Sequence, residues 1–259
     1  QLVSKNAALK EALLAVKDVY EQAEVAGISS FFKNSGVGVG LPDTGRCIIS
    51  VEEGKIHVRT SAACIGQGMA TVTTQIACET LNLPPEMIVA EAPDTRRTPN
   101  SGTTTASRQS LFTGEATRRA AMQLRYELDM GRALSDLEGE EFYGEYSAKT
   151  DPLINDKKSP VSHAGYGYAA EVAILDDKGK VAKFVAAYDM GQVVNPRAAE
   201  GQIEGGIAMG MGYALTEKFA LEEGYVKAKY ATLGLVNATQ VPPIETILIH
   251  ADNLHEGLA

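Results

Sequence analysis

The 259-residue sequence has no tryptophan, only three cysteines and no long hydrophobic run. A helix that crosses a bilayer needs about 18 or more consecutive apolar residues, and no stretch comes near that length. The chain opens at Gln1 without methionine or a signal-peptide pattern, which we interpret as the cut end of a longer chain. We therefore expect a cytoplasmic protein with no membrane partner.

Cysteine and histidine are too scattered to suggest a disulfide framework or a metal site ligated by side chains. Cys47, Cys64 and Cys78 are an odd set without a Cys-x-x-Cys spacing, which favours a reducing compartment. Zinc and iron sites need clustered ligands, so we predict none. The histidines are His57, His163, His250 and His255.

Positive charge is also scarce, because the chain has 24 Lys and Arg but 33 Asp and Glu, which gives a net charge of −9. Nucleic acids and anionic membranes select clustered Lys and Arg, so neither is an expected partner. A single basic loop can still hold an anion. The 44% hydrophobic and 22% charged content is ordinary for a globular protein, and the length allows one large domain or two lobes.

Two segments each show the pattern of a β-hairpin, a loop, a helix and a strand, which predicts an α+β fold. In the first, strands over 47–51 and 56–60 flank a turn at 52–55, and the alternation of apolar residues leaves His57 facing solvent. A helix over 69–81 and a strand over 87–90 follow. In the second, strands over 169–175 and 181–188 precede a helix over about 196–219 and a strand over 244–249.

Two further helices are predicted from apolar residues at helical spacing, over 6–24 and 110–129. Residues 136–162 are polar and indicate a linker or surface excursion. We therefore expect two similar lobes, each a hairpin or sheet with a packed helix. The first lobe covers 1–135 with the N-terminal helix, the linker covers 136–162, and the second lobe covers 163–259.

Three loops rich in glycine, glutamine or hydroxyl groups lead into predicted helices. In the first, Gly66 and Gly68 let main-chain N–H groups approach an anion, and Gln67 adds an amide. A tight turn without a ligand explains this loop equally well. In the second, residues 103–110 hold five hydroxyls and Arg108 at a helix N-terminus, which favours anion binding over simple capping.

The third loop, 189–196, runs into a helix whose Pro196 stands at the first position. Glycine costs roughly 1 kcal/mol relative to alanine inside a helix, yet this one contains Gly201, Gly205 and Gly206. Close helix packing is one explanation. A flat group lying against Gln202 and Gly206 is the other.

Together these loops resemble the molybdopterin-binding region of the xanthine dehydrogenase/aldehyde oxidase family of molybdenum hydroxylases. The matching segments occur in the family's order from about residue 36 onward, and the ordered set is more specific than any one motif. They are 66–68, 73–77, 93–95, 103–110, 114–116, 167–172, 189–191, 195–196 and 201–206.

The resemblance implies how a cofactor would be held. In this family the dithiolene sulfurs of a pterin bind molybdenum, which agrees with the lack of a Cys/His cluster. Gln67, between Gly66 and Gly68, would lie near the metal's oxygen ligands, and Gln202 would hydrogen-bond the pterin. Ala106, Ser107, Arg108 and Gln109 would receive the phosphate end through main-chain and side-chain groups. Bacterial members often carry the cytosine dinucleotide form of molybdopterin, and iron–sulfur clusters and FAD would lie in other domains or subunits.

One part of the family pattern is missing. The family's general base is a glutamate in a Gly-Val-Gly-Glu-like motif, which we expect beyond Ala259, with the second lobe truncated before it. We interpret Glu171 and Glu204 as structural. The chain is therefore expected to supply no catalytic residue and to be inactive alone. Its partners would be other domains or subunits of the same hydroxylase, and an oligomer is compatible with the sequence.

The resemblance implies an oxidoreductase that oxidises a purine, an N-heterocycle or an aldehyde with water as the oxygen source. Two alternatives stay open. The chain could be a cofactor-holding subunit that a partner bearing the glutamate completes. It could also be an unrelated α+β protein that binds a phosphate or nucleotide without redox chemistry.

Overall fold

The computed structural model describes residues 8–229 and 231–249, which form two compact units. One unit consists of residues 33–167. The other combines residues 8–32 with 168–249. Among the described residues, no helix is long and apolar enough to cross a membrane.

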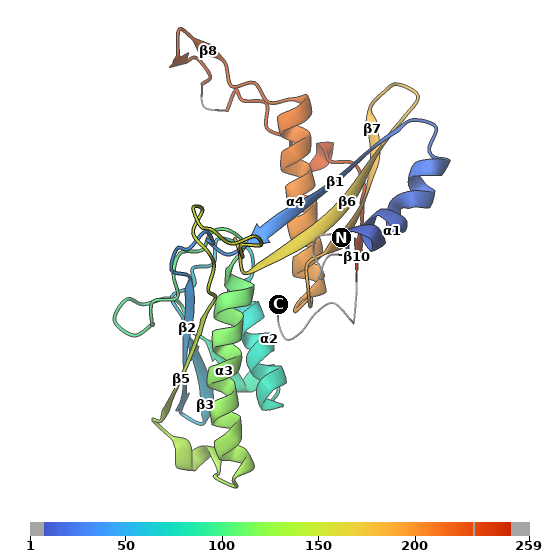
Figure 1. Ribbon diagram of the computed structural model, residues 1–259. Helices are drawn as coiled ribbons and strands as arrows, with labels where there is room; N and C mark the ends of the chain where they lie inside the picture. Colours follow the sequence, from blue (N-terminus) through green and yellow to red (C-terminus); the bar gives the residue numbers. More distant parts are fainter. Residues whose placement is uncertain (1–7, 230, 250–259) are drawn as a thin grey trace. The chain divides into compact units, whose positions relative to one another are not determined.

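The 33–167 unit is a four-stranded sheet in the order β4-β3-β2-β5, with helices α2 and α3 on one face (Figure 1). β2 and β3 form the predicted hairpin, β5 lies antiparallel to β2, and β4 lies parallel to β3 after the α2 crossover. The elements are β2 (Thr44–Glu52), β3 (Lys55–Arg59), α2 (Met69–Leu81), a short 3-10 helix (Pro85–Met87), β4 (Ile88–Ala90), α3 (Gln109–Asp129), a second 3-10 helix (Leu134–Leu137) and β5 (Glu141–Ser147).

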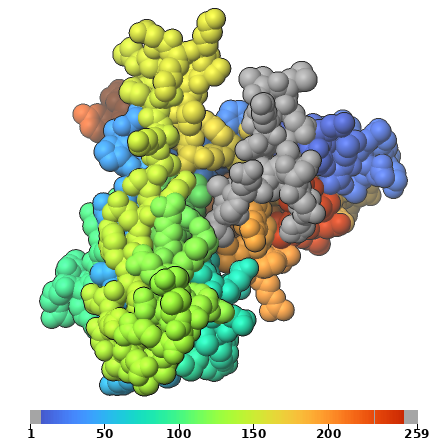
Figure 2. All heavy atoms as spheres, turned by 60° about the horizontal axis from the view of Figure 1, so that its bottom comes forward, coloured from blue at the N-terminus to red at the C-terminus, as the bar shows by residue number. Residues whose placement is uncertain are grey.

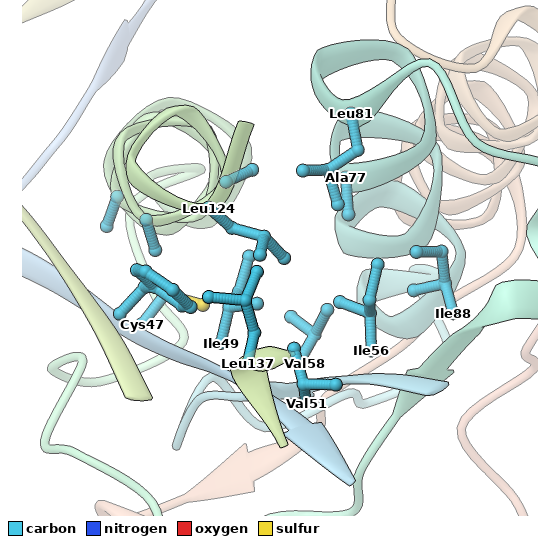
Figure 3. Packing of buried hydrophobic residues seen from close by; sticks show 14 residues of the cluster. Cys47, Ile49, Val51, Ile56, Val58, Ala77, Leu81, Ile88, Leu124 and Leu137 are labelled. Carbon is cyan, nitrogen blue, oxygen red and sulfur yellow. The ribbon is translucent and has the colours of Figure 1, made fainter. Parts of the chain in front are cut away.

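Strand alternation places the core of this unit between the sheet and its helices. Cys47, Ile49 and Val51 of β2 are fully buried against residues such as Leu81 of α2 and Leu124 of α3 (Figure 3). Helix α3 comes unusually close to the strands at Gly144, where an added Cβ would lie 1.9 Å from a main-chain oxygen of α3. Helix α3 is thereby held directly against the sheet.

The other unit has a sheet in the order β1-β6-β7-β10, in which β6 and β7 form an antiparallel hairpin and β10 lies parallel to β7. Val185 and Ala187 of β7 contact α1, whereas Ala186 contacts α4, so the two helices cover opposite faces. The elements are α1 (Leu9–Gln22), β1 (Ala26–Ser35), β6 (Gly165–Leu175), β7 (Val181–Asp189), α4 (Pro196–Leu215), β8 (Leu221–Glu222), β9 (Tyr225–Val226), a 3-10 helix (Ala238–Gln240) and β10 (Ile244–Leu248).

The predicted α+β fold is confirmed, because each sheet contains a hairpin followed by a helix and a parallel strand. Three expectations differ from the structure. The N-terminal helix packs on β7 rather than within the first lobe, since Ala12 and Val16 find their apolar partners there. Residues 141–147 of the expected linker form β5, whose Phe142 is buried against the core. The helix over 196–219 ends at Leu215.

Candidate functional site

The N-termini of α2 and α3 lie at the same end of the 33–167 unit. Near the N-termini of both helices, the Thr104 hydroxyl donates to the carbonyl oxygen of Ala63 over 2.8 Å. Near the end of α2, the guanidinium of Arg125 on α3 donates to the carbonyl oxygen of Leu81 over 2.9 Å. The helices therefore run in parallel, and their positive ends favour an anion in one region.

The Gly66–Gly68 loop is open on the side where glycine lacks a side chain. Gly66 and Gly68 have φ of 111° and 84°, a conformation that glycine adopts without strain. No heavy atom lies within 4 Å of a Cβ built on either glycine, so this side of the loop is open space. Gly68 is the N-cap of α2 and supplies no side-chain cap.

Gln67 is turned back onto its own loop. Its Oε1 accepts from the main-chain N–H of Ile65 over 2.6 Å, and its Nε2 donates to the carbonyl oxygen of Ala63 over 3.2 Å. The amide is assigned in this orientation by its partners. Gln67 can therefore reach a ligand only by exchanging these local bonds.

Cys64 shows the electrostatic preference of this loop. Its exposed thiol faces the main-chain N–H groups of Gly66, Met69 and Gly68, and these donors hold the pKa of the thiol below its ordinary value. N–H groups at a helix start stabilise a thiolate as they would another anion. The lowered pKa of Cys64 could not be predicted from the sequence, because it depends on the path of the following loop.

The second loop turns sharply before α3. Ala106 and Ser107 have φ of 49° and 51°, which costs a non-glycine residue roughly 1–2 kcal/mol. Arg108 then returns to the right-handed region as the N-cap of α3, again without a side-chain cap. Left-handed and right-handed residues in succession point consecutive N–H groups to one side, which is an anion-binding arrangement. Exposed Ser107 and Ser110 add hydroxyl groups beside it.

The Arg108 side chain does not face this turn. It is 1% exposed, and its Nε donates to Asp43 Oδ1 over 2.5 Å. Its other nitrogens donate to the carbonyl oxygens of Ser101, Thr103 and Thr44, and the guanidinium lies 4.9 Å from the ring centre of Phe112. The Arg108 side chain is therefore fully engaged within the protein, and its main-chain N–H donates to the carbonyl oxygen of Thr105 over 3.2 Å.

The remaining expected site residues lie in different places. Gln109 is buried, with its Nε2 donating to Thr104 and its Oε1 accepting from Thr113. Gln202 is exposed on α4 in the other unit, beside glycines whose Cβ positions are also open. The glutamate expected beyond Ala259 falls outside the described residues.

An ion network on the opposite face of the sheet was not predicted. Arg59 is 2% exposed and pairs with Glu52, Glu91 and Glu141. His57 is 2.8 Å from Glu91 rather than facing solvent as expected. Glu52, His57 and Glu91 bring possible metal-ligand atoms within 4.8 Å of one another. Because Arg59 and Arg97 already neutralise the two carboxylates, we assign no metal here.

Comparison with known proteins identifies the family of this chain. A family model described as the molybdopterin cofactor-binding domain matches residues 7–139 and 133–242. A xanthine dehydrogenase molybdenum-binding subunit from Escherichia coli is 28% identical over 232 residues, which are 76% of this chain and 31% of that protein. An aldehyde oxidoreductase from Megalodesulfovibrio gigas is 29% identical over 229 residues, or 77% of this chain and 25% of that protein.

A solved structure of an aldehyde oxidoreductase also has a similar fold. The aldehyde oxidoreductase structure from Desulfovibrio desulfuricans matches with a TM-score of 0.75 and 24% identity, over 94% of this chain and 30% of that chain. The present chain thus spans about a third or less of the length of these relatives. It belongs to the molybdopterin cofactor-binding domain family of the xanthine dehydrogenases and aldehyde oxidoreductases.

Proposed function

We propose that this chain holds molybdopterin as part of a molybdenum hydroxylase that oxidises a purine, an N-heterocycle or an aldehyde with water as the oxygen source. The paired N-termini of α2 and α3, both without side-chain caps, carry the proposal. The names of the relatives, a molybdenum-binding subunit and an aldehyde oxidoreductase, support it. We further propose the cytosine dinucleotide form of the cofactor and a cytoplasmic location.

The described residues fit a cofactor that has an anionic end. The turn at Ala106 and Ser107 offers main-chain N–H groups, and exposed Ser107 and Ser110 add hydroxyl donors. The open side of Gly66 and Gly68 leaves room for a ligand against the main chain. We assign the phosphate end to the 106–109 turn and the metal end to Gln67, with Gln202 toward the pterin.

When bound, molybdopterin would supply the molybdenum that accepts electrons from the substrate. The role of this chain is then to bind and orient the cofactor. The general base, the iron–sulfur clusters and FAD would come from other domains or subunits of the same enzyme. A cofactor-holding subunit completed by a partner chain is the variant of this proposal in which the glutamate lies on another polypeptide.

The first experiment measures molybdenum and pterin in the full-length parent enzyme, purified with protection from oxygen. Stoichiometric molybdenum supports the proposal. A bound nucleotide without molybdenum, in cells that make the cofactor, would instead indicate a phosphate-binding protein without redox chemistry.

A matched pair of variants then tests the site. Ser110→Glu places a carboxylate on the exposed first turn of α3, where it competes with a bound anion. The same charge in Met130→Glu lies at the other end of α3, which Figure 2 shows at the molecular surface (yellow-green, front). A negative charge near a helix N-terminus stabilises the helix by about 0.3–1 kcal/mol. Reduced cofactor content in Ser110→Glu alone would therefore not reflect unfolding, and equal content in both variants would contradict the assigned site.

A further inference from the structure

The two loops of the 33–167 unit meet at one carbonyl group. The oxygen of Ala63 accepts from Gln67 Nε2 over 3.2 Å and from Thr104 Oγ1 over 2.8 Å. Thr104 lies 41 residues further along the chain, on the second loop. A carbonyl oxygen has two lone pairs, so these two donors satisfy it completely.

The bond from Thr104 has a fixed direction. The Thr113 hydroxyl donates to Gln109 Oε1 over 2.5 Å, and Gln109 Nε2 donates to Thr104 Oγ1 over 3.1 Å. Thr104 therefore accepts on one side and turns its own hydrogen toward Ala63. Gln109 is 5% exposed and Thr113 is fully buried, so the bond between them is shielded from water, whereas the bond from Thr104 to Ala63 is exposed. Hydrogen bonds in such a chain polarise and strengthen one another.

We propose that Thr104 is a positioning residue that couples the Gly66–Gly68 loop to the Ala106–Ser107 turn. This inference rests on the proposed function, because it makes both loops parts of one cofactor site. A rigid ligand that touches both loops binds more tightly when their separation is fixed in advance. Thr104 fixes that separation through its hydrogen bond to the carbonyl oxygen of Ala63, which also orients the Gln67 side chain.

The test compares three variants of the full-length enzyme. Thr104→Val keeps the shape of the side chain and removes the hydroxyl, whereas Thr104→Ser restores it. Thr105→Val removes a neighbouring exposed hydroxyl for which no hydrogen bond to the described chain is seen. Hydrogen exchange is followed by mass spectrometry in protein made without molybdopterin, so the result does not depend on the cofactor.

We expect Thr104→Val to speed exchange about two- to tenfold, the effect of losing one hydrogen bond, in residues 63–68 as well as 103–109. Thr104→Ser should behave like the wild type, and Thr105→Val should leave 63–68 unchanged. Faster exchange confined to 103–109 in Thr104→Val would overturn the coupling.

Cofactor retention gives a second readout. We expect the loaded Thr104→Val enzyme to release molybdopterin about two- to tenfold faster than the wild type, and Thr104→Ser to release it at the wild-type rate. Release from Thr104→Val at the wild-type rate would overturn the positioning role. If the wild-type enzyme holds no molybdopterin, the proposed function fails, while the exchange experiment still decides whether the loops are coupled.

Discussion

Replacing Asp43 by asparagine removes the counter-charge of a buried guanidinium, and we expect this to cost about 3–5 kcal/mol of stability. The Asp43 and Arg108 side chains are 3% and 1% exposed, so solvent cannot replace the lost charge. Asp43 also accepts from the main-chain N–H of Val37 over 2.7 Å. The substitution therefore disturbs both the start of β2 and the 103–109 loop.

The magnitude follows from the cost of leaving one buried charge without its partner. For a chain of this size, each 1 kcal/mol lowers the unfolding midpoint by about 2–4 °C. The Asp43→Asn midpoint should therefore fall by roughly 6–20 °C.

The assay is unfolding of wild type and variants by urea, which gives the free energy, and by heating, which gives the midpoint temperature, both followed by circular dichroism. Asp129→Asn is the matched control, because Asp129 also pairs with an arginine at 2.8 Å but is 56% exposed. An exposed pair at this helical spacing contributes only about 0.3–0.5 kcal/mol. If Asp43→Asn costs no more than this control, the pair is accessible to water and our account of Arg108 is wrong.

Other predictions follow from single contacts. Gly144→Ala forces a Cβ to within 1.9 Å of Ala116 and should destabilise the chain by about 1–3 kcal/mol or more, whereas Gly165→Ala, with no neighbour within 4 Å, should be tolerated in the same unfolding assay. The hydrogen bond from Arg59 lowers the pKa of Glu52 below its ordinary value of 4.5. This hydrogen bond therefore stabilises the folded state above that value, and the stabilisation is lost as the pH falls through the lowered pKa. The stability difference between wild type and Glu52→Gln should shrink below about pH 4.5, and a constant difference would refute this. Burial raises the pKa of Cys47 to about 12, whereas the pKa of exposed Cys64 is lowered, so iodoacetamide at pH 8 should label Cys64 first and Cys47 only on unfolding.

The hairpins, the crossover helices and the parallel strands could be predicted because each follows from local periodicity. Ile56 and Val58 alternate with polar neighbours, and glycine marks the turn at Gly54. The loops that we propose to bind an anion could also be recognised locally, as glycines and hydroxyls directly before apolar helices. Membership of the family came from the order of these segments.

Other features depend on contacts between distant residues. The orientation of Arg108 is set by Asp43, 65 residues earlier, so the sequence alone favoured a solvent-facing phosphate ligand. Strand β5 looked like an acidic linker because Gly144, which faces α3, replaces the apolar residue expected at that position. Strand β1 was missed because its central residues are exposed and show no alternation.

The division of the chain into units has a consequence for the order of folding during synthesis. The 33–167 unit is continuous, so a ribosome that adds about 5–20 residues per second releases it as one piece. Among the strands that the structure describes, β1 pairs only with β6, which begins at Gly165 and emerges roughly ten seconds later. During that delay Ile28, Phe31 and Phe32 lie on an unpaired strand, which is the type of segment that chaperones shield from aggregation.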